Sequence, residues 1–178
     1  SANLSHRPDL VVIGNAVSRN NAEVQATGQM GLAYCSMPQA VNRFAAAGKR
    51  QILVAGTHGK TTTSSLLASI LFHAKRDPSF IIGSTMSNLG VNAHAGQGNA
   101  FVIEADEYDR MFLGLKPRVA IVTNLEHDHP DCYPTYEDMH TAFESFVDLL
   151  PADGTLIVCA DDIGSASLIN QARKAGRP

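Results

Sequence analysis

The chain is built around nine residues, Ala55-Gly56-Thr57-His58-Gly59-Lys60-Thr61-Thr62-Thr63. A largely apolar run, residues 51–54, precedes this stretch, and a helical pattern, residues 64–71, follows it. A strand, a glycine loop and a helix in this order can hold phosphate groups. Glycines let backbone N–H groups approach an anion, and the helix N-terminus adds the positive end of its dipole. The stretch therefore predicts a phosphate-binding loop.

This loop is shorter than the pattern G-x-x-x-x-G-K-[ST], which would place glycine where Val54 stands. A strand–helix turn that happens to contain glycines and a lysine is the alternative interpretation. The strand and the helix on either side favour the phosphate loop, because the motif requires both. In that role Lys60 supplies a charge for the β- and γ-phosphates, and the Thr61 hydroxyl can reach Mg²⁺.

Composition limits the classes of protein that fit. The 178 residues suit one domain, or one domain plus part of another, and the 44% hydrophobic content supports a buried core. A net charge of -3 argues against a broad basic face for nucleic acid but is compatible with a nucleotide. No apolar run is long enough to insert into a membrane, and the N-terminus lacks the layout of a signal peptide.

The three cysteines, Cys35, Cys132 and Cys159, are far apart and form no C-x-x-C pair, which is typical of a reduced, cytoplasmic protein. The chain opens on Ser1 rather than on methionine. We therefore expect it to start inside a longer protein.

Short apolar runs alternate with helical patterns. Strands are expected at residues 10–14, 32–35, 51–54, 80–83, 100–104, 118–124 and 155–159. Helices are expected at residues 20–29, 36–47, 64–74, 135–150 and 161–174. This alternation predicts an α/β fold with a mostly parallel sheet flanked by helices. Residues 84–99 are rich in Gly, Asn and Ser and are expected to form a long loop that is functional or mobile.

In such a sheet, ligands bind beyond the carboxyl ends of the strands. One strand end carries Glu104-Ala105-Asp106-Glu107-Tyr108-Asp109. A carboxylate beside a phosphate loop is where a Mg²⁺ ligand is needed, because hard cations take oxygen ligands and share them with phosphates. Glu104 directly follows four apolar residues and is the candidate. Asp109 is better explained as part of a solvated turn.

Another strand end carries Thr123-Asn124-Leu125-Glu126-His127-Asp128-His129-Pro130-Asp131. The pair His127 and His129 alone would suggest zinc, but the two side chains would point to opposite sides of an extended segment, and no other Cys/His pair has ligand spacing. A single imidazole that helps hold a second Mg²⁺, or that contacts the γ-phosphate, fits better.

With these residues in place, the chain resembles the Mur ligases, the ATP-dependent amide-forming enzymes of peptidoglycan synthesis. The resemblance covers about residues 9–165 and depends on three blocks whose order and spacing agree with the family. They are Gly56-Thr57-His58-Gly59-Lys60-Thr61-Thr62, Glu104-Ala105-Asp106-Glu107 and Thr123-Asn124-Leu125-Glu126-His127-Asp128-His129-Pro130-Asp131.

The resemblance implies a P-loop type central domain, with ATP and Mg²⁺ as cofactors and Lys60, Glu104 and His129 as catalytic residues. The implied nucleotide-binding residues are Gly56, Thr57, His58, Gly59, Lys60, Thr61 and Thr62. Thr61 and Glu104 would hold one Mg²⁺, and His129 would help hold a second. In the family mechanism a substrate carboxylate attacks the γ-phosphate of ATP to give an acyl phosphate. An amino group then displaces the phosphate.

Two branches of the family fit. One joins L-alanine to UDP-N-acetylmuramate and is the first choice; the other attaches an intact murein tripeptide to the same acceptor. The resemblance further implies that residues 1–50 are the C-terminal half of a Rossmann-like UDP-substrate-binding domain. Residues 51–178 would be an incomplete central ATP-binding domain. We expect this piece alone to be inactive. One alternative interpretation is a nucleotide-binding fragment with no turnover of its own. Another is a P-loop NTPase switch or motor, which is disfavoured because no N-K-x-D-type run or arginine-finger candidate stands out.

The sequence departs from the family in two places. Several Mur ligases use a carbamylated lysine on the helix after the His129 position, but no lysine lies between Lys116 and Lys174. Either Glu144 or a neighbour takes its place, or the second metal is held differently. In addition, His94 stands where the family's substrate loop is expected to carry arginine.

Overall fold

The computed structural model describes residues 2–14, 17–174 and 176. Its main element is a six-stranded sheet with the order β5-β4-β6-β3-β7-β8. The strands are β3 (Arg50–Ala55), β4 (Ser79–Ile81), β5 (Ala93–His94), β6 (Ala100–Glu104), β7 (Val119–Val122) and β8 (Thr155–Val158). All neighbouring pairs are parallel except β4 and β5. The predicted α/β fold with a mostly parallel sheet is therefore confirmed.

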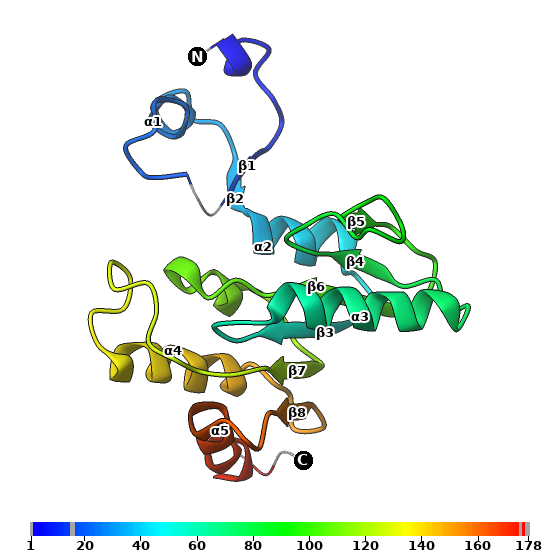
Figure 1. Ribbon diagram of the computed structural model, residues 1–178. Helices are drawn as coiled ribbons and strands as arrows, with labels where there is room; N and C mark the ends of the chain where they lie inside the picture. The colour runs from blue at the N-terminus through cyan, green and yellow to red at the C-terminus, as the bar shows by residue number, and fades with distance from the viewer. Residues whose placement is uncertain (1, 15–16, 175, 177–178) are drawn as a thin grey trace.

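Helices cover both faces of this sheet (Figure 1). They are α3 (Lys60–His73), α4 (Tyr136–Asp148) and α5 (Ile163–Lys174), together with the 3-10 helix η3 (Tyr108–Gly114). Alternate residues of a strand point to opposite faces, so β6 contributes to two cores. Phe101 and Ile103 belong to the core with α4 and α5, and Val102 packs with Ala68 of α3.

The N-terminal part forms a separate two-stranded parallel sheet of β1 (Val11–Ile13) and β2 (Tyr34–Ser36), which lies above the main sheet in Figure 1. Around it lie η1 (Ala2–Leu4), α1 (Ala22–Gln29) and α2 (Met37–Ala40), which continues into a π-helix, η2 (Val41–Ala45). The N-cap of α1 is Asn21, whose side chain accepts from the Glu23 N–H. Pro38 lies in the first turn of α2, where its missing N–H costs little.

The boundaries differ from expectation at three places. The helix expected at residues 36–47 is a short α-helix followed by a π-turn. The expected loop 84–99 contains β5, which adds an antiparallel edge to the sheet. Residues 108–114 form η3, which was not predicted because Asp109 and Arg110 take left-handed backbone conformations, with φ of 50° and 57°, that leave no helical sequence pattern.

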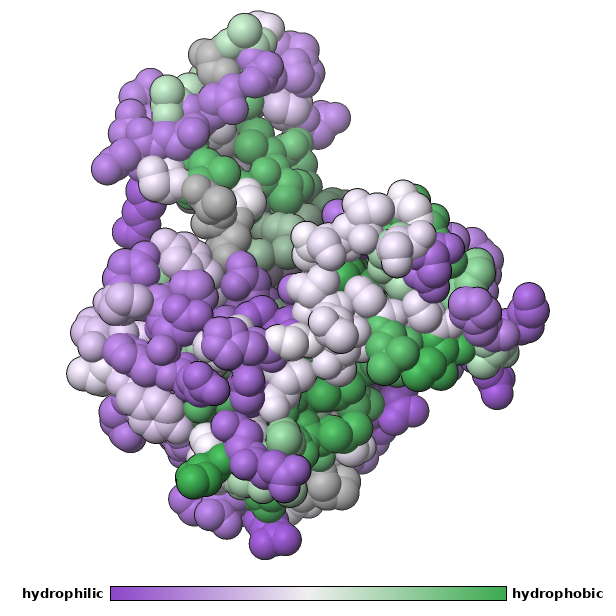
Figure 2. Space-filling view, in the orientation of Figure 1, coloured by the Kyte–Doolittle hydropathy of each residue, from purple (hydrophilic) through white to green (hydrophobic). Residues whose placement is uncertain are grey.

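Some large apolar side chains of α3 are exposed at the surface. Figure 2 shows apolar side chains gathered over α3, where Leu66 and Ile70 lie one turn apart and are largely exposed. Among the described residues, none of the helices is both long enough and apolar enough to cross a membrane.

Candidate functional site

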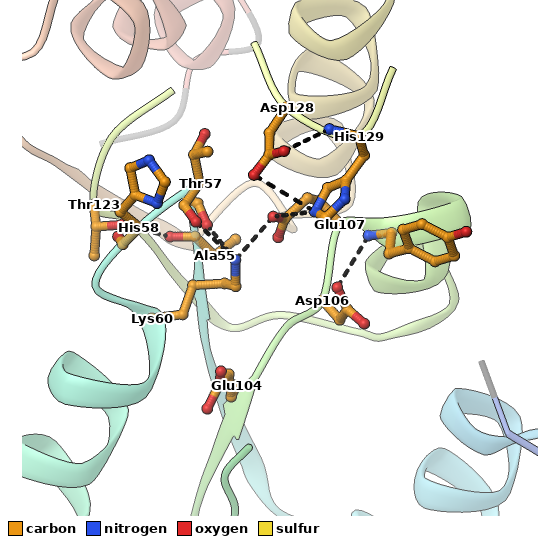
Figure 3. A network of polar contacts seen from close by, with 12 residues as sticks. Ala55, Thr57, His58, Lys60, Glu104, Asp106, Glu107, Thr123, Asp128 and His129 are labelled. Carbon is orange, nitrogen blue, oxygen red and sulfur yellow. Dashed lines mark hydrogen bonds and ion pairs between the residues drawn. The ribbon is translucent and has the colours of Figure 1, made fainter. Parts of the chain in front are cut away.

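Three adjacent strands bring the predicted site residues together. β3 lies between β6 and β7, and all three run parallel. Their carboxyl ends therefore meet at one edge of the sheet, where β3 leads into residues 56–59, β6 into Glu104–Glu107 and β7 into residues 123–131. Figure 3 shows side chains from these three segments around a common centre. The segments that the sequence places at strand ends therefore lie at the same edge of the sheet.

The loop after β3 needs glycine at two positions. Gly56 has φ of 126°, and a Cβ atom there would lie 2.2 Å from Thr123 Oγ1 and 2.9 Å from the Asn124 carbonyl oxygen. Gly59 has φ of 80° and caps the N-terminus of α3, with open space around it. Gly56 allows the backbone to pass close to β7, and Gly59 turns the chain into the helix.

The segment after β7 anchors this loop through hydrogen bonds. Thr57 Oγ1 accepts from the Glu126 N–H at 2.9 Å and donates to the Glu126 carbonyl at 3.0 Å. The Asn124 side-chain oxygen accepts from the His58 N–H at 2.8 Å, and Thr123 Oγ1 donates to the His58 carbonyl at 2.6 Å. Thr57 and His58 are therefore fixed by backbone and side-chain contacts, while the His58 ring is mostly exposed and lies 3.9 Å from the Glu126 carboxylate.

Lys60 is the first residue of α3 and bends back over the loop. Its Nζ donates to the Gly56 carbonyl at 2.7 Å, the Thr57 carbonyl at 3.2 Å and Glu107 Oε1 at 2.8 Å. An ammonium group has three donors, so all three are in use. Lys60 therefore lies directly after the loop, where the motif predicts it, with a carboxylate as its ionic partner.

Thr61 and Glu104 are also brought together. The Thr61 hydroxyl donates to Glu104 Oε1 at 2.7 Å, and the Gly83 N–H donates to Glu104 Oε2 at 2.6 Å. Hydroxyl and carboxylate oxygens are the ligands that Mg²⁺ takes when it shares its coordination with phosphates. The pair is close enough for one cation to contact both oxygens. Thr62, by contrast, is exposed on the outer side of the first turn of α3.

His129 lies on the other side of Glu107 (Figure 3). Its Nε2 is 3.6 Å from Glu107 Oε1 and 3.9 Å from Asp128 Oδ2, and its ring meets the Tyr108 ring edge to face at 5.2 Å. The backbone at His129 is left-handed, with φ of 53°. The His127 side chain does not share these partners: its Nε2 contacts the Tyr133 carbonyl at 2.8 Å. The two histidines therefore have different partners.

Glu107 is the central residue that sequence reasoning missed. It was quoted within the acidic segment after β6 but given no role, yet its side chain is 0% exposed and contacts both Lys60 and His129. Burial raises the pKa of Glu107, and the hydrogen bond from Lys60 opposes this rise. The available signal was that a largely buried lysine beside the loop needs a carboxylate counter-ion.

Other candidate residues lie away from this centre. His94 is on β5, at the edge of the sheet, where its Nε2 lies 3.1 Å from Asp77 Oδ1. Glu144 lies on α4, 3.9 Å from His140 Nδ1 one turn earlier. Asp109 is exposed in η3, as the solvated-turn interpretation expects.

Within the part of the chain that the structure describes, no group of three or more His, Cys, Asp or Glu side chains is arranged to hold a metal. The Thr61–Glu104 pair nevertheless fits a cation that completes its coordination with ligand oxygens and water, as Mg²⁺ does when bound with phosphates.

Comparison with known proteins agrees with this geometry. The family model described as "Mur ligase middle domain" matches residues 54–177. The UDP-N-acetylmuramate–L-alanine ligase of Arthrobacter sp. (strain FB24) is 46% identical over 168 residues, which are 94% of this chain and 36% of that protein. The corresponding ligase of Saccharopolyspora erythraea is 44% identical and is covered to 34%. This chain therefore spans about a third of the length of these relatives.

Solved structures show the same architecture. The UDP-N-acetylmuramate:L-alanyl-gamma-D-glutamyl-meso-diaminopimelate ligase from Neisseria meningitides superposes with a TM-score of 0.85 at 34% identity, covering 97% of this chain and 58% of that one. The UDP-N-acetylmuramate–alanine ligase from Thermotoga maritima gives a TM-score of 0.78 at 27% identity, with 94% and 39% coverage. The matched residues include the loop and both of its partner segments, and the chain belongs to the Mur ligase family.

Proposed function

We propose that this chain is the nucleotide-binding part of an ATP-dependent ligase of peptidoglycan precursor synthesis, which joins L-alanine to UDP-N-acetylmuramate. One observation carries the proposal: Lys60, Thr61 and Glu104 meet at the ends of adjacent parallel strands, with the Thr61 hydroxyl 2.7 Å from the Glu104 carboxylate. This is a set of groups suited to a magnesium–triphosphate complex. The relatives named as L-alanine ligases support the choice of substrate.

The domain division follows from the same proposal. Residues 1–50 would belong to a UDP-substrate-binding domain and residues 51–178 to the central ATP-binding domain. The separate two-stranded sheet of β1 and β2 supports this division, because β3 at residue 50 begins a different sheet. The free cysteines Cys35, Cys132 and Cys159 are compatible with a cytoplasmic location.

In the proposed reaction the loop binds and orients the phosphates. Lys60 keeps its contact with Glu107 and exchanges those with the loop carbonyls for phosphate oxygens, and the N-terminus of α3 presents N–H groups to the same anion. Thr61 and Glu104 would hold one Mg²⁺, and His129 would help to hold a second. Bound Mg²⁺ would neutralise the charge that develops on the phosphates.

The chemistry then takes place among ATP, UDP-N-acetylmuramate and L-alanine. The carboxylate of UDP-N-acetylmuramate attacks the γ-phosphorus, ADP leaves, and an acyl phosphate forms. The amine of L-alanine attacks the acyl carbon, phosphate leaves with the bonding electrons, and the amine loses a proton. The contribution of this chain is positioning and electrostatic stabilisation.

A tripeptide donor in place of L-alanine is the second candidate. The observation in its favour is the TM-score of 0.85 to a solved ligase whose name specifies the tripeptide. Identity to that ligase is 34%, below the 46% found with an L-alanine ligase. Since a shared fold does not select between donors, we give more weight to the sequence identity.

The test is phosphate release by the full-length protein that contains this chain, with ATP, Mg²⁺ and UDP-N-acetylmuramate. Release that requires L-alanine supports the proposal, and release that requires the tripeptide supports the second candidate. Lys60→Ala is expected to abolish release. Lys116→Ala, at an exposed lysine before β7, is the matched control and should turn over like the unchanged protein. Release that depends on neither donor would contradict the ligase function.

A further inference from the structure

Glu107 places one buried carboxylate between basic groups from two other strand ends. Its Oε1 lies 2.8 Å from Lys60 Nζ, after β3, and 3.6 Å from His129 Nε2, after β7. Glu107 itself follows β6. A single oxygen atom therefore links the phosphate loop to the histidine turn across the three central strands (Figure 3).

The backbone of Glu107 is fixed from two sides. Its carbonyl accepts a hydrogen bond from the Arg110 N–H at 2.9 Å and another from the Tyr133 hydroxyl. Tyr133 is fully buried, and its N–H donates to the His129 carbonyl at 2.8 Å. The carboxylate and the histidine turn thus share one anchor, which keeps the distance between Glu107 and His129 defined.

A contribution to folding stability does not explain why a carboxylate is buried at Glu107. The second oxygen, Glu107 Oε2, is buried and has no hydrogen-bond partner among the described residues. A buried acceptor without a partner costs stability, and a buried ion pair often stabilises a fold no more than an apolar pair of the same size would. If position 107 served only to fill the core, an apolar side chain would stabilise the fold more than the Glu107 carboxylate does.

We propose that Glu107 is a positioning residue of the phosphate site, which holds the Lys60 ammonium and the His129 imidazole at a fixed separation so that both face the same ligand. The inference deepens the proposed function and rests on it for the kinetic test. Glu107 acts through these two residues: with a fully buried side chain, it is not placed to touch the nucleotide.

The kinetic test compares two substitutions in the full-length protein. Glu107→Ala removes the link, and because misplacement of a catalytic group by about 1 Å can cost about 10²-fold, kcat should fall by roughly that factor. The KM for ATP should rise by less than about tenfold, because the phosphate contacts of the loop amides remain. Glu107→Gln keeps an oxygen that accepts from Lys60 and should recover kcat to within about tenfold of the unchanged protein.

A second measurement is independent of turnover. An ammonium held by three acceptors exchanges its protons slowly, so Lys60 should give a ¹H–¹⁵N signal in protein labelled at lysine, identified by its loss in Lys60→Ala. The signal should disappear in Glu107→Ala and persist in Glu107→Gln. Asp153→Asn is the matched control: it removes the carboxylate of an exposed ion pair with Arg118, before β7, and should leave both readouts unchanged.

The outcomes separate the two proposals. Loss of kcat and of the ammonium signal in Glu107→Ala, both restored in Glu107→Gln, supports the inference. An unchanged kcat in Glu107→Ala, or a Glu107→Gln variant as impaired as Glu107→Ala, overturns it. Should Glu107→Ala fail to fold by its melting curve, Glu107→Gln decides: an ammonium signal lost there overturns the inference. Phosphate release that needs neither donor sinks the ligase function, and the ammonium signal then still tests Glu107.

Discussion

A methyl group at Gly56 would have no room in this fold. The Cβ atom would lie 2.2 Å from Thr123 Oγ1, 2.9 Å from the Asn124 carbonyl oxygen and 3.0 Å from the Thr123 nitrogen. Two of these three atoms belong to the backbone that leaves β7, which cannot turn aside as a flexible side chain could. Gly56→Ala must therefore move either the phosphate loop or the end of β7.

The expected magnitude has two parts. A φ of 126° is one that L-residues rarely adopt, and such strain costs about 1–3 kcal/mol. Forcing an extra carbon into a packed site costs about a further 1–3 kcal/mol. The sum, about 2–6 kcal/mol, is a large part of the roughly 5–15 kcal/mol by which a domain is stable.

The assay is urea unfolding, with Gly48→Ala as the matched control. Gly48 has φ of 74°, but a Cβ there would meet nothing within 4 Å. Its substitution should therefore cost only the backbone strain, about 1–2 kcal/mol. The excess loss in Gly56→Ala over Gly48→Ala then reports mainly the steric contribution at the loop. Equal losses in Gly56→Ala and Gly48→Ala would refute the argument that β7 packs against the loop.

Three further predictions concern neighbouring contacts. Asp162→Ala should destabilise the protein by about 1 kcal/mol, because its carboxylate accepts from two backbone N–H groups, at Leu125 and at the start of α5. Burial would raise the Asp162 pKa, but these hydrogen bonds lower it on balance. The stability that the Asp162 carboxylate contributes is therefore fully present above its unfolded pKa of about 3.9, and it is lost as the pH falls through its lower pKa in the folded protein. Urea unfolding at pH 7 and at pH 3 should accordingly show a smaller effect of Asp162→Ala at pH 3. Tyr108→Phe should raise the pKa of Asp131, because the hydrogen bond from the Tyr108 phenol at 2.7 Å holds that pKa below its usual value. NMR titration of the carboxyl group measures this pKa, and a value that stayed low in the variant would contradict the prediction. Asn124→Ala should cost about 0.5–1.5 kcal/mol by urea unfolding, because it removes a hydrogen bond to the exposed His58 N–H, and a loss no larger than in an exposed Asn→Ala variant that breaks no hydrogen bond would refute it.

The sequence predicted most of the architecture because the central strands β3, β6 and β7 are largely buried and are therefore recognisable as short apolar runs. β3, β6 and β7 were expected within a few residues of their bounds. The elements that were missed lack such a pattern. β5 has two residues and is exposed, and η3 depends on left-handed backbone at Asp109 and Arg110, a conformation that is uncommon for residues other than glycine.

The same distinction explains which site residues could be found. Lys60, Thr61 and Glu104 are adjacent to the glycines or to a strand end, so local order in the sequence was enough to place them. Glu107 acquires its partners only when β6 folds beside β3, and the left-handed turn at His129 aims the imidazole at it. The spacing of residues along the chain does not predict such contacts between segments that follow different strands.

The hydrogen bonds that tie Thr57 and His58 to the segment after β7 have a consequence for how a ligand arrives. They give the loop its shape during folding, so the cradle is preorganised and a ligand need not order it. Binding then avoids the entropic cost of freezing a mobile loop, which is about 1–2 kcal/mol for each residue fixed. Association should accordingly proceed at a rate set by diffusion and by the exchange of the Lys60 contacts.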